Sequence, residues 1–94
     1  MSTVTNPALI VRQKRCEDWI VELIVRSATP GRLSADQMDT NTNHAGWRKA
    51  FTRRGITNAL NTLQEGESPT LVRDPDGTYI LPAVALLATM GLVA

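Results

Sequence analysis

The chain has 94 residues, enough for one domain around a single hydrophobic core and too few for two. Its formal net charge of +1 lacks the basic excess usual in nucleic-acid-binding domains, so any such function depends on where the charges lie. Cys16 and His44 are the single cysteine and the single histidine. They exclude an internal disulfide and a Cys/His metal site, and they favour a cytoplasmic protein.

The first helix is predicted to begin near Asn6, after a flexible stretch over residues 1–5. Asn6 can cap this helix, and Pro7 suits its first turn because proline has no N–H to leave unsatisfied. We expect Cys16 to be a buried structural thiol and the helix to end at Pro30–Gly31. Apolar residues recur mainly at steps of three and four, which indicates one buried face: Leu9, Ile10, Cys16, Trp19, Ile20, Leu23 and Ile24.

A short strand at Arg32–Leu33 is predicted next, followed by a short helix that Ser34 caps and that runs through Asp39. The segment from Asp39 to His44 is polar throughout and is predicted to be a loop. Nothing in the sequence partners His44, which favours a surface histidine over a catalytic or metal-binding one.

The segment from Ala45 to Glu65 carries two apolar faces that do not fit one helix. Trp47 and Ile56 are nine residues apart, so on a continuous helix they would lie on opposite sides. We therefore predict two helices with a turn at Arg53–Gly55, the second covering residues 56–65, and Gly66 closing it in a left-handed conformation. The two faces are Trp47, Ala50 and Phe51, and then Ile56, Ala59, Leu60 and Leu63.

A β-hairpin is predicted over residues 70–81, because two β-rich runs flank Asp74-Pro75-Asp76-Gly77. Pro-Asp-Gly favours a tight turn, since proline presets φ and glycine accepts a positive φ. Residues 83–94 are apolar and predict a last helix, buried in the core or at an interface. This run is shorter than the about 20 residues that a bilayer span needs, so no membrane association is expected.

This order of elements resembles the winged-helix family, a winged helix-turn-helix fold that is mainly α with a small β-hairpin (α+β). The matching layout covers residues 45–81 and consists of Leu60, Leu63, Gly66, Gly77 and Tyr79. The resemblance implies four to five helices and a two-stranded wing in a single domain over residues 1–94. It leaves open whether residues 34–39 or 45–53 form the family's second helix, and the face argument favours the latter.

The resemblance also implies a DNA-binding transcriptional regulator, with helix 56–65 in the major groove and hairpin 70–81 as the wing. Asn can read adenine bidentately, and basic residues near a recognition helix can neutralise phosphates. The terminal helices would form a homodimer on double-stranded DNA. The candidate DNA-binding residues are Arg48, Lys49, Arg53, Arg54, Thr57, Asn58, Asn61 and Arg73.

A second hypothesis is a phage or mobile-element module that binds a protein partner with the same scaffold and inhibits host machinery. This hypothesis is based on the near-neutral net charge and on the acidic residues around the hairpin, which would repel phosphates: Glu65, Glu67, Asp74 and Asp76. Motifs of catalysis, metal binding and phosphate-loop binding are absent from the sequence, so we predict no enzyme and no cofactor.

Overall fold

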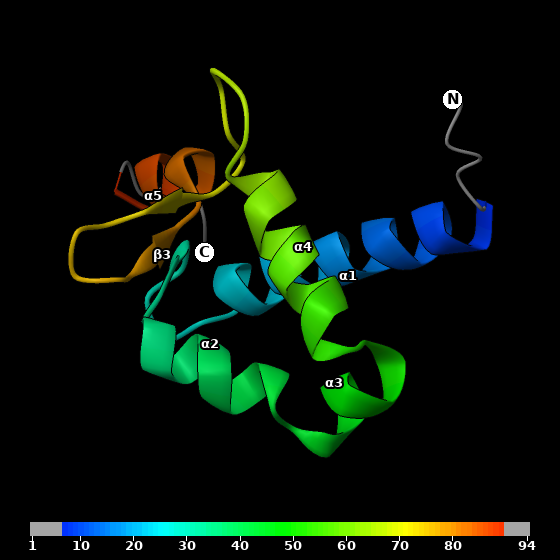
Figure 1. The fold of residues 1–94 in the computed structure, drawn as a ribbon. Helices are drawn as coiled ribbons and strands as arrows, with labels where there is room; N and C mark the ends of the chain where they lie inside the picture. Colours follow the sequence, from blue (N-terminus) through cyan, green and yellow to red (C-terminus); the bar gives the residue numbers. More distant parts are fainter. Residues whose placement is uncertain (1–6, 90–94) are drawn as a thin grey trace.

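A computed structural model describes residues 7–89 of the chain, and within that range it contains five helices and one small antiparallel sheet (Figure 1). The predicted class, mainly α with a small β element, is confirmed. The elements are α1 Pro7–Val25, β1 Arg32–Leu33, α2 Ala35–Thr42, α3 Ala45–Ala50, α4 Arg53–Leu63, β2 Val72–Arg73, β3 Tyr79–Ile80 and α5 Pro82–Thr89.

Helix α4 packs against α1, and the two helices cross each other (Figure 1). Cys16, Ile20 and Ile24 are fully buried along the inner face of α1, as the apolar spacing predicts. The prediction is wrong for Ile10 and Trp19, which are 53% and 39% exposed because they lie off the side that α4 covers. Helix α1 ends at Val25, before the predicted Pro30–Gly31, because the chain folds back onto its last turn: the Gly31 N–H donates to the Ile24 carbonyl at 3.2 Å. The predicted cap Asn6 lies outside the described residues.

Helix α2 extends further than predicted, so the expected loop from Asp39 to His44 is wrong for residues 39–42 and is confirmed only for Asn43 and His44. Ser34 caps the helix as expected, but the helix continues to Thr42. Short polar side chains bond back to carbonyls one turn earlier, as Thr42 Oγ1 does to Met38 at 2.8 Å. Met38 and Thr42 also share the buried face, so tertiary packing overrides the loop-like composition.

The tight connection between α3 and α4 exists, but not at Arg53–Gly55. Helix α3 ends at Ala50, and only Phe51 and Thr52 precede α4, which covers 53–63 rather than 56–65. Thr52 is the N-cap, and its Oγ1 accepts the Gly55 N–H at 3.0 Å. The helix boundary is therefore set by a threonine cap, and Gly55 lies in the first helical turn.

The hairpin is present, and it belongs to a larger sheet than the sequence predicts. Strand β3 lies between β2 and β1 in the order β1-β3-β2, with both pairings antiparallel. The predicted strand at Arg32–Leu33 is thus the third strand, and Leu33 pairs with Tyr79. Gly77 takes φ +93° in the turn, and Gly66 takes φ +89° after α4, as predicted for both glycines.

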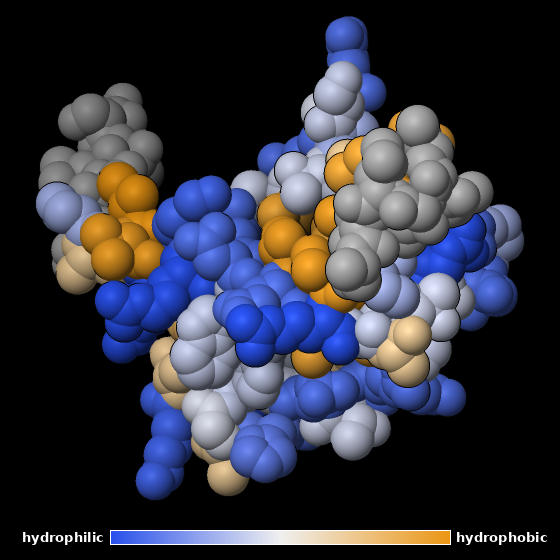
Figure 2. Space-filling view, turned by 180° about the vertical axis from the view of Figure 1, so that it is seen from behind, coloured by the Kyte–Doolittle hydropathy of each residue, from blue (hydrophilic) through white to orange (hydrophobic). Residues whose placement is uncertain are grey.

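Helix α5 begins at Pro82, one residue before the predicted 83–94 helix, and its predicted end lies outside the described residues. It packs on the turn before β1, where Gly31 approaches the Ala85 backbone so closely that a Cβ would lie 2.8 Å from the Ala85 nitrogen. Leu86 and Leu87 remain exposed. Figure 2 shows apolar surface beside the two ends of the chain, with hydrophilic side chains between them.

Candidate nucleic-acid interface

Helix α4 is held by one apolar side and presents a polar one. Ile56, Ala59 and Leu63 are buried against the core, as the sequence predicts. The opposite side is exposed and carries neutral hydrogen-bonding groups and one cation: Arg54, Thr57, Asn58, Asn61 and Thr62. A rigidly mounted helix of this kind can offer amides and hydroxyls to a partner without unfolding.

An aromatic cluster fixes α3 and the start of α4 on α1. The Trp19 ring meets Trp47 at 5.2 Å and Phe51 at 5.1 Å between centroids, both edge to face. Such contacts stabilise by about 0.5–1.5 kcal/mol each beyond their area burial. Trp47 and Phe51 therefore pack together as predicted, and they hold in place the segment that bears the basic residues.

Four of the five predicted cations lie around this junction and are exposed. Arg48 and Lys49 occupy the last turn of α3, while Arg53 and Arg54 occupy the first turn of α4. The sequence contains no acidic residue from 40 to 64, so no carboxylate on these two helices offsets their charge. This junction is the most basic part of the chain.

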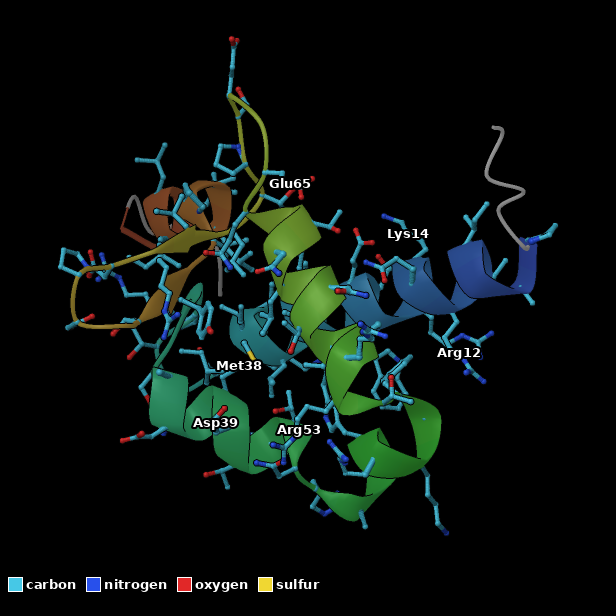
Figure 3. The ribbon with its side chains drawn as sticks, viewed as in Figure 1. Arg12, Lys14, Met38, Asp39, Arg53 and Glu65 are labelled. Carbon is cyan, nitrogen blue, oxygen red and sulfur yellow. The ribbon has the colours of Figure 1, made fainter. Side chains whose placement is uncertain are left out.

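Two predicted cations, one on α3 and one on α4, line a cavity that also borders α2. Arg48, Arg53 and Thr57 line this cavity, which has a volume of about 240 Å³. Asp39 lines the same cavity from α2, and Figure 3 shows its carboxylate on the side of α2 near Arg53. This flank of α4 thus mixes charges.

On the other flank, α4 faces α1 and the charge is of one sign. Arg54 and Asn58 line a cavity of about 380 Å³ together with Arg12 and Gln13 of α1. Gln13 Nε2 also donates to Thr62 Oγ1 at 3.4 Å. Sequence reasoning missed Arg12, because only the crossing of α1 and α4 brings residues so distant in sequence together.

Arg73 does not join this group. It lies on β2 in the sheet, and its guanidinium carbon is 5.0 Å from the centre of the Tyr79 ring, which indicates a cation–π contact. Asp74 and Asp76 flank the turn that follows. The Thr78 N–H donates to Asp76 Oδ1 at 2.9 Å, and this bond lowers the pKa of the Asp76 carboxyl. The Asp76 carboxyl at the hairpin tip is therefore ionised at neutral pH.

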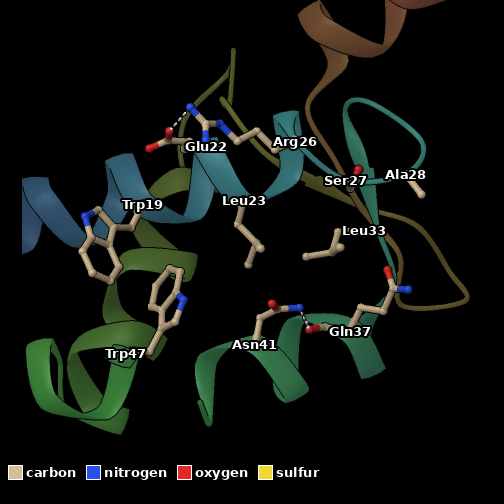
Figure 4. Close-up of a pocket in the computed structure, with 10 residues that line it drawn as sticks. All are labelled: Trp19, Glu22, Leu23, Arg26, Ser27, Ala28, Leu33, Gln37, Asn41 and Trp47. Atoms are coloured by element: carbon tan, nitrogen blue, oxygen red, sulfur yellow. Dashed lines mark hydrogen bonds and ion pairs between the residues drawn. The ribbon is translucent and has the colours of Figure 1, made fainter. Parts of the chain in front are cut away.

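A further cavity, of about 440 Å³, lies between α1 and α2 (Figure 4). Trp19 and Trp47 stand at one end, and Leu23 and Leu33 line it further along. Its one cation, Arg26, is paired with Glu22 at 2.9 Å. This cavity offers no unneutralised positive charge, which separates it from the α3–α4 junction.

The contacts of Cys16 and His44 indicate a structural role for both side chains. Burial, and then the charge of Glu17, raise the pKa of the Cys16 thiol to about 11, so the thiol stays protonated at neutral pH. His44 caps α3 by accepting the Gly46 N–H on Nδ1 at 3.1 Å. No group of three metal-ligating side chains occurs among residues 7–89. Over the same range, no helix is both long and apolar enough to span a bilayer.

Comparisons with protein-family models, with curated proteins and with solved structures find no match for this chain. The function proposed below is therefore inferred from the residues of this chain alone.

Proposed function

We propose that the protein is a small winged helix-turn-helix regulator that binds double-stranded DNA, with α4 in the major groove. The carrying observation is the exposed Asn and Thr face of α4 beside four cations in a stretch of chain without a carboxylate. With 11 residues and about 1.5 Å of rise per residue, α4 is long enough to lie along several base pairs. Asn58 and Asn61 would contact base edges.

The order of elements supports the same proposal. A two-residue connection joins α3 to α4, and a hairpin follows α4 in the chain. In this scheme α3 and α4 form the helix–turn–helix, and β2 with β3 forms the wing. Arg48, Lys49, Arg53 and Arg54 would bind phosphates, which position the helix without reading sequence. The proposal places the protein in the cytoplasm, together with its DNA.

A salt titration of binding to a fluorescent duplex tests this function. We expect the affinity to fall steeply as salt rises, because phosphate contacts release counterions. Arg53→Ala with Arg54→Ala should weaken binding at least about tenfold. Lys14→Ala with Arg26→Ala is the matched control: it removes the same charge, but from cations that Asp18 and Glu22 already pair. Equal weakening by both pairs of substitutions would contradict the proposal.

We further propose a homodimer that joins through the terminal helices. Exposed apolar side chains remain near both ends of the described chain: Ile10, Val11, Leu86 and Leu87. A second copy would cover them and present two α4 helices to two half-sites. Leu86→Asp with Leu87→Asp should convert a sedimenting dimer into a monomer, and a wild-type monomer at high concentration would refute this part.

A protein partner is the second candidate. Carboxylates at the hairpin tip and in the segment after α4 favour it, because they repel a phosphate backbone where a wing would approach: Glu65, Glu67, Asp74 and Asp76. If wild-type protein retains no duplex even at low salt and captures a defined host protein instead, this candidate replaces DNA binding.

A further inference from the structure

The first half of α1 carries cations that belong neither to the hairpin nor to the helix–turn–helix. Arg12, Lys14 and Arg15 precede the first acidic residue of the chain, Glu17. Lys14 pairs with Asp18 at 3.5 Å, and Arg26 pairs with Glu22 at the far end of the helix. Within residues 7–89 these are the only ion pairs that involve α1, so neither Arg12 nor Arg15 is paired with a carboxylate there.

Arg12 and Arg15 lie on the side of α1 that faces α3 and α4. Arg12 lines the cavity of about 380 Å³ that it shares with Arg54, and also a neighbouring cavity of about 390 Å³ that it shares with Arg15 and Lys49. In Figure 3, Arg12 points toward the α3 side of α1 and Lys14 toward the opposite side. The two cavities share Arg12 and Phe51, and we call them together the trough. Its cations are Arg12 and Arg15 on the α1 side and Lys49 and Arg54 on the side of α3 and α4.

The base of this trough is closed and unreactive. Cys16 and Phe51 line it and are buried, and the Cys16 thiol lies 3.9 Å from the Gly55 carbonyl. The rest of the lining is polar and includes Gln13 and Asn58 as well as the two arginines. These features suit an elongated anion, because the arginines that line the trough can bind its charged groups.

We propose that this trough binds the sugar–phosphate backbone of one DNA strand, with Arg12 and Arg15 on one bank and Lys49 and Arg54 on the other. The inference rests on the proposed function, since the strand concerned borders the groove that α4 enters. Arginine is suited to the role because its planar guanidinium binds phosphate oxygens bidentately. The α1 contacts hold the backbone on the flank of α4 that lacks Asp39.

The number of phosphates contacted is measurable from the salt dependence of binding. Each lost contact reduces the magnitude of the negative slope of log affinity against log salt by about 0.9. Arg12→Ala with Arg15→Ala should therefore make the slope less negative by about 2 and weaken binding about tenfold near physiological salt. Preference among duplex sequences should stay unchanged, because phosphate contacts do not read bases.

The experiment compares four proteins on short fluorescent duplexes, with circular dichroism to confirm folding. They are the wild type, Arg12→Ala/Arg15→Ala, its conservative version Arg12→Lys/Arg15→Lys, and the control Lys14→Ala/Arg26→Ala. All substitutions fall on exposed residues, of α1 or, for Arg26, of the turn directly after it. We expect the lysine version and the control to retain nearly the wild-type slope, since the first keeps both charges and the second removes only paired ones.

An unchanged slope in Arg12→Ala/Arg15→Ala would overturn the inference, and so would an equal fall in the control. Tighter binding to a single strand than to the duplex would also overturn it. The proposed function is judged separately by Arg53→Ala/Arg54→Ala. If that variant loses binding while the α1 variant behaves as wild type, DNA binding stands and the α1 contact fails. If wild-type protein binds no duplex at all, both fail.

Discussion

The α3–α4 junction and the sheet are opposite in charge although both are exposed. Around the junction, cations lie on three helices, and residues 40–64 contribute no carboxylate. At the sheet and in the segment that leads to it, four carboxylates lie between residues 65 and 76. They outnumber the two arginines of the sheet, which are Arg73, resting over Tyr79, and Arg32 on β1. The net charge of +1 is therefore the sum of two unlike regions, and it conceals a surface suited to a polyanion.

The two regions also differ in how they are held. The junction depends on side chains, namely the aromatic cluster around Trp19 and the Thr52 cap. The sheet side depends on close backbone packing. Helix α5 follows the short strands directly, and its backbone at Ala85 lies against the backbone of Gly31. Substitutions can therefore test each region separately.

The largest expected effect is at the sheet side. Gly31→Ala places a Cβ 2.8 Å from the Ala85 nitrogen at a φ of +84°, so both strain and a backbone clash oppose it. We expect a loss of about 2–5 kcal/mol in the free energy of unfolding. Gly66→Ala is the control, since it has φ +89° with open space around it and should cost only about 1–2 kcal/mol. Equal losses in urea unfolding would show that α5 does not press on Gly31.

The next effect concerns the thiol buried beneath the junction. The pKa of Cys16 is raised from 9.0 to about 11, so above pH 9 the unfolded thiol releases its proton before the folded one does. The resulting stabilisation is full below pH 9 and is lost as pH rises toward about 11. Wild-type protein should lose about 2–3 kcal/mol over that range relative to Cys16→Ala. Parallel pH profiles of unfolding for the two proteins would contradict a buried thiol.

The Thr52 cap should have a smaller effect. Thr52→Ala removes the acceptor for the Gly55 N–H and should cost about 1 kcal/mol of stability. Thr57→Ala, on the exposed side of the same helix, should change stability by less than about 0.5 kcal/mol. If thermal unfolding ranks the two variants the other way, α4 does not begin at Thr52.

The smallest effect tests the charge contrast itself. Glu65→Gln with Glu67→Gln removes two exposed carboxylates beyond the end of α4. Duplex affinity at low salt should rise about twofold to fivefold and return to the wild-type value at high salt, because the repulsion is screened over about 10 Å. No change at low salt would mean that bound DNA stays away from this end of α4.

The sequence predicted those features that depend on residues close together in the chain. Periodicity indicated the helices and the hairpin, Ser34 was recognisable as a cap, and Gly77 as a turn residue. The buried position of Cys16 followed from the same patterns. These features arise from local backbone preferences and from one-sided burial.

Most of the errors lie where distant parts of the chain meet. The Asp39–Thr42 segment is helical because Thr42 is buried in the assembled core, and β1 pairs with β3 across much of the sequence. Arg12 was missed as a candidate binding residue for the same reason, since its neighbours Lys49 and Arg54 are distant in sequence. The misplaced turn before α4 is instead a local error, because a threonine cap, and not a glycine, sets it.

The salt dependence of duplex binding by the wild-type protein tests the central claim most directly. Four to six phosphate contacts from the α3–α4 junction and α1 predict a slope of log affinity against log salt between about −3.6 and −5.4. A slope near zero, or no binding to any duplex at low salt, would contradict the assignment of this basic surface to DNA.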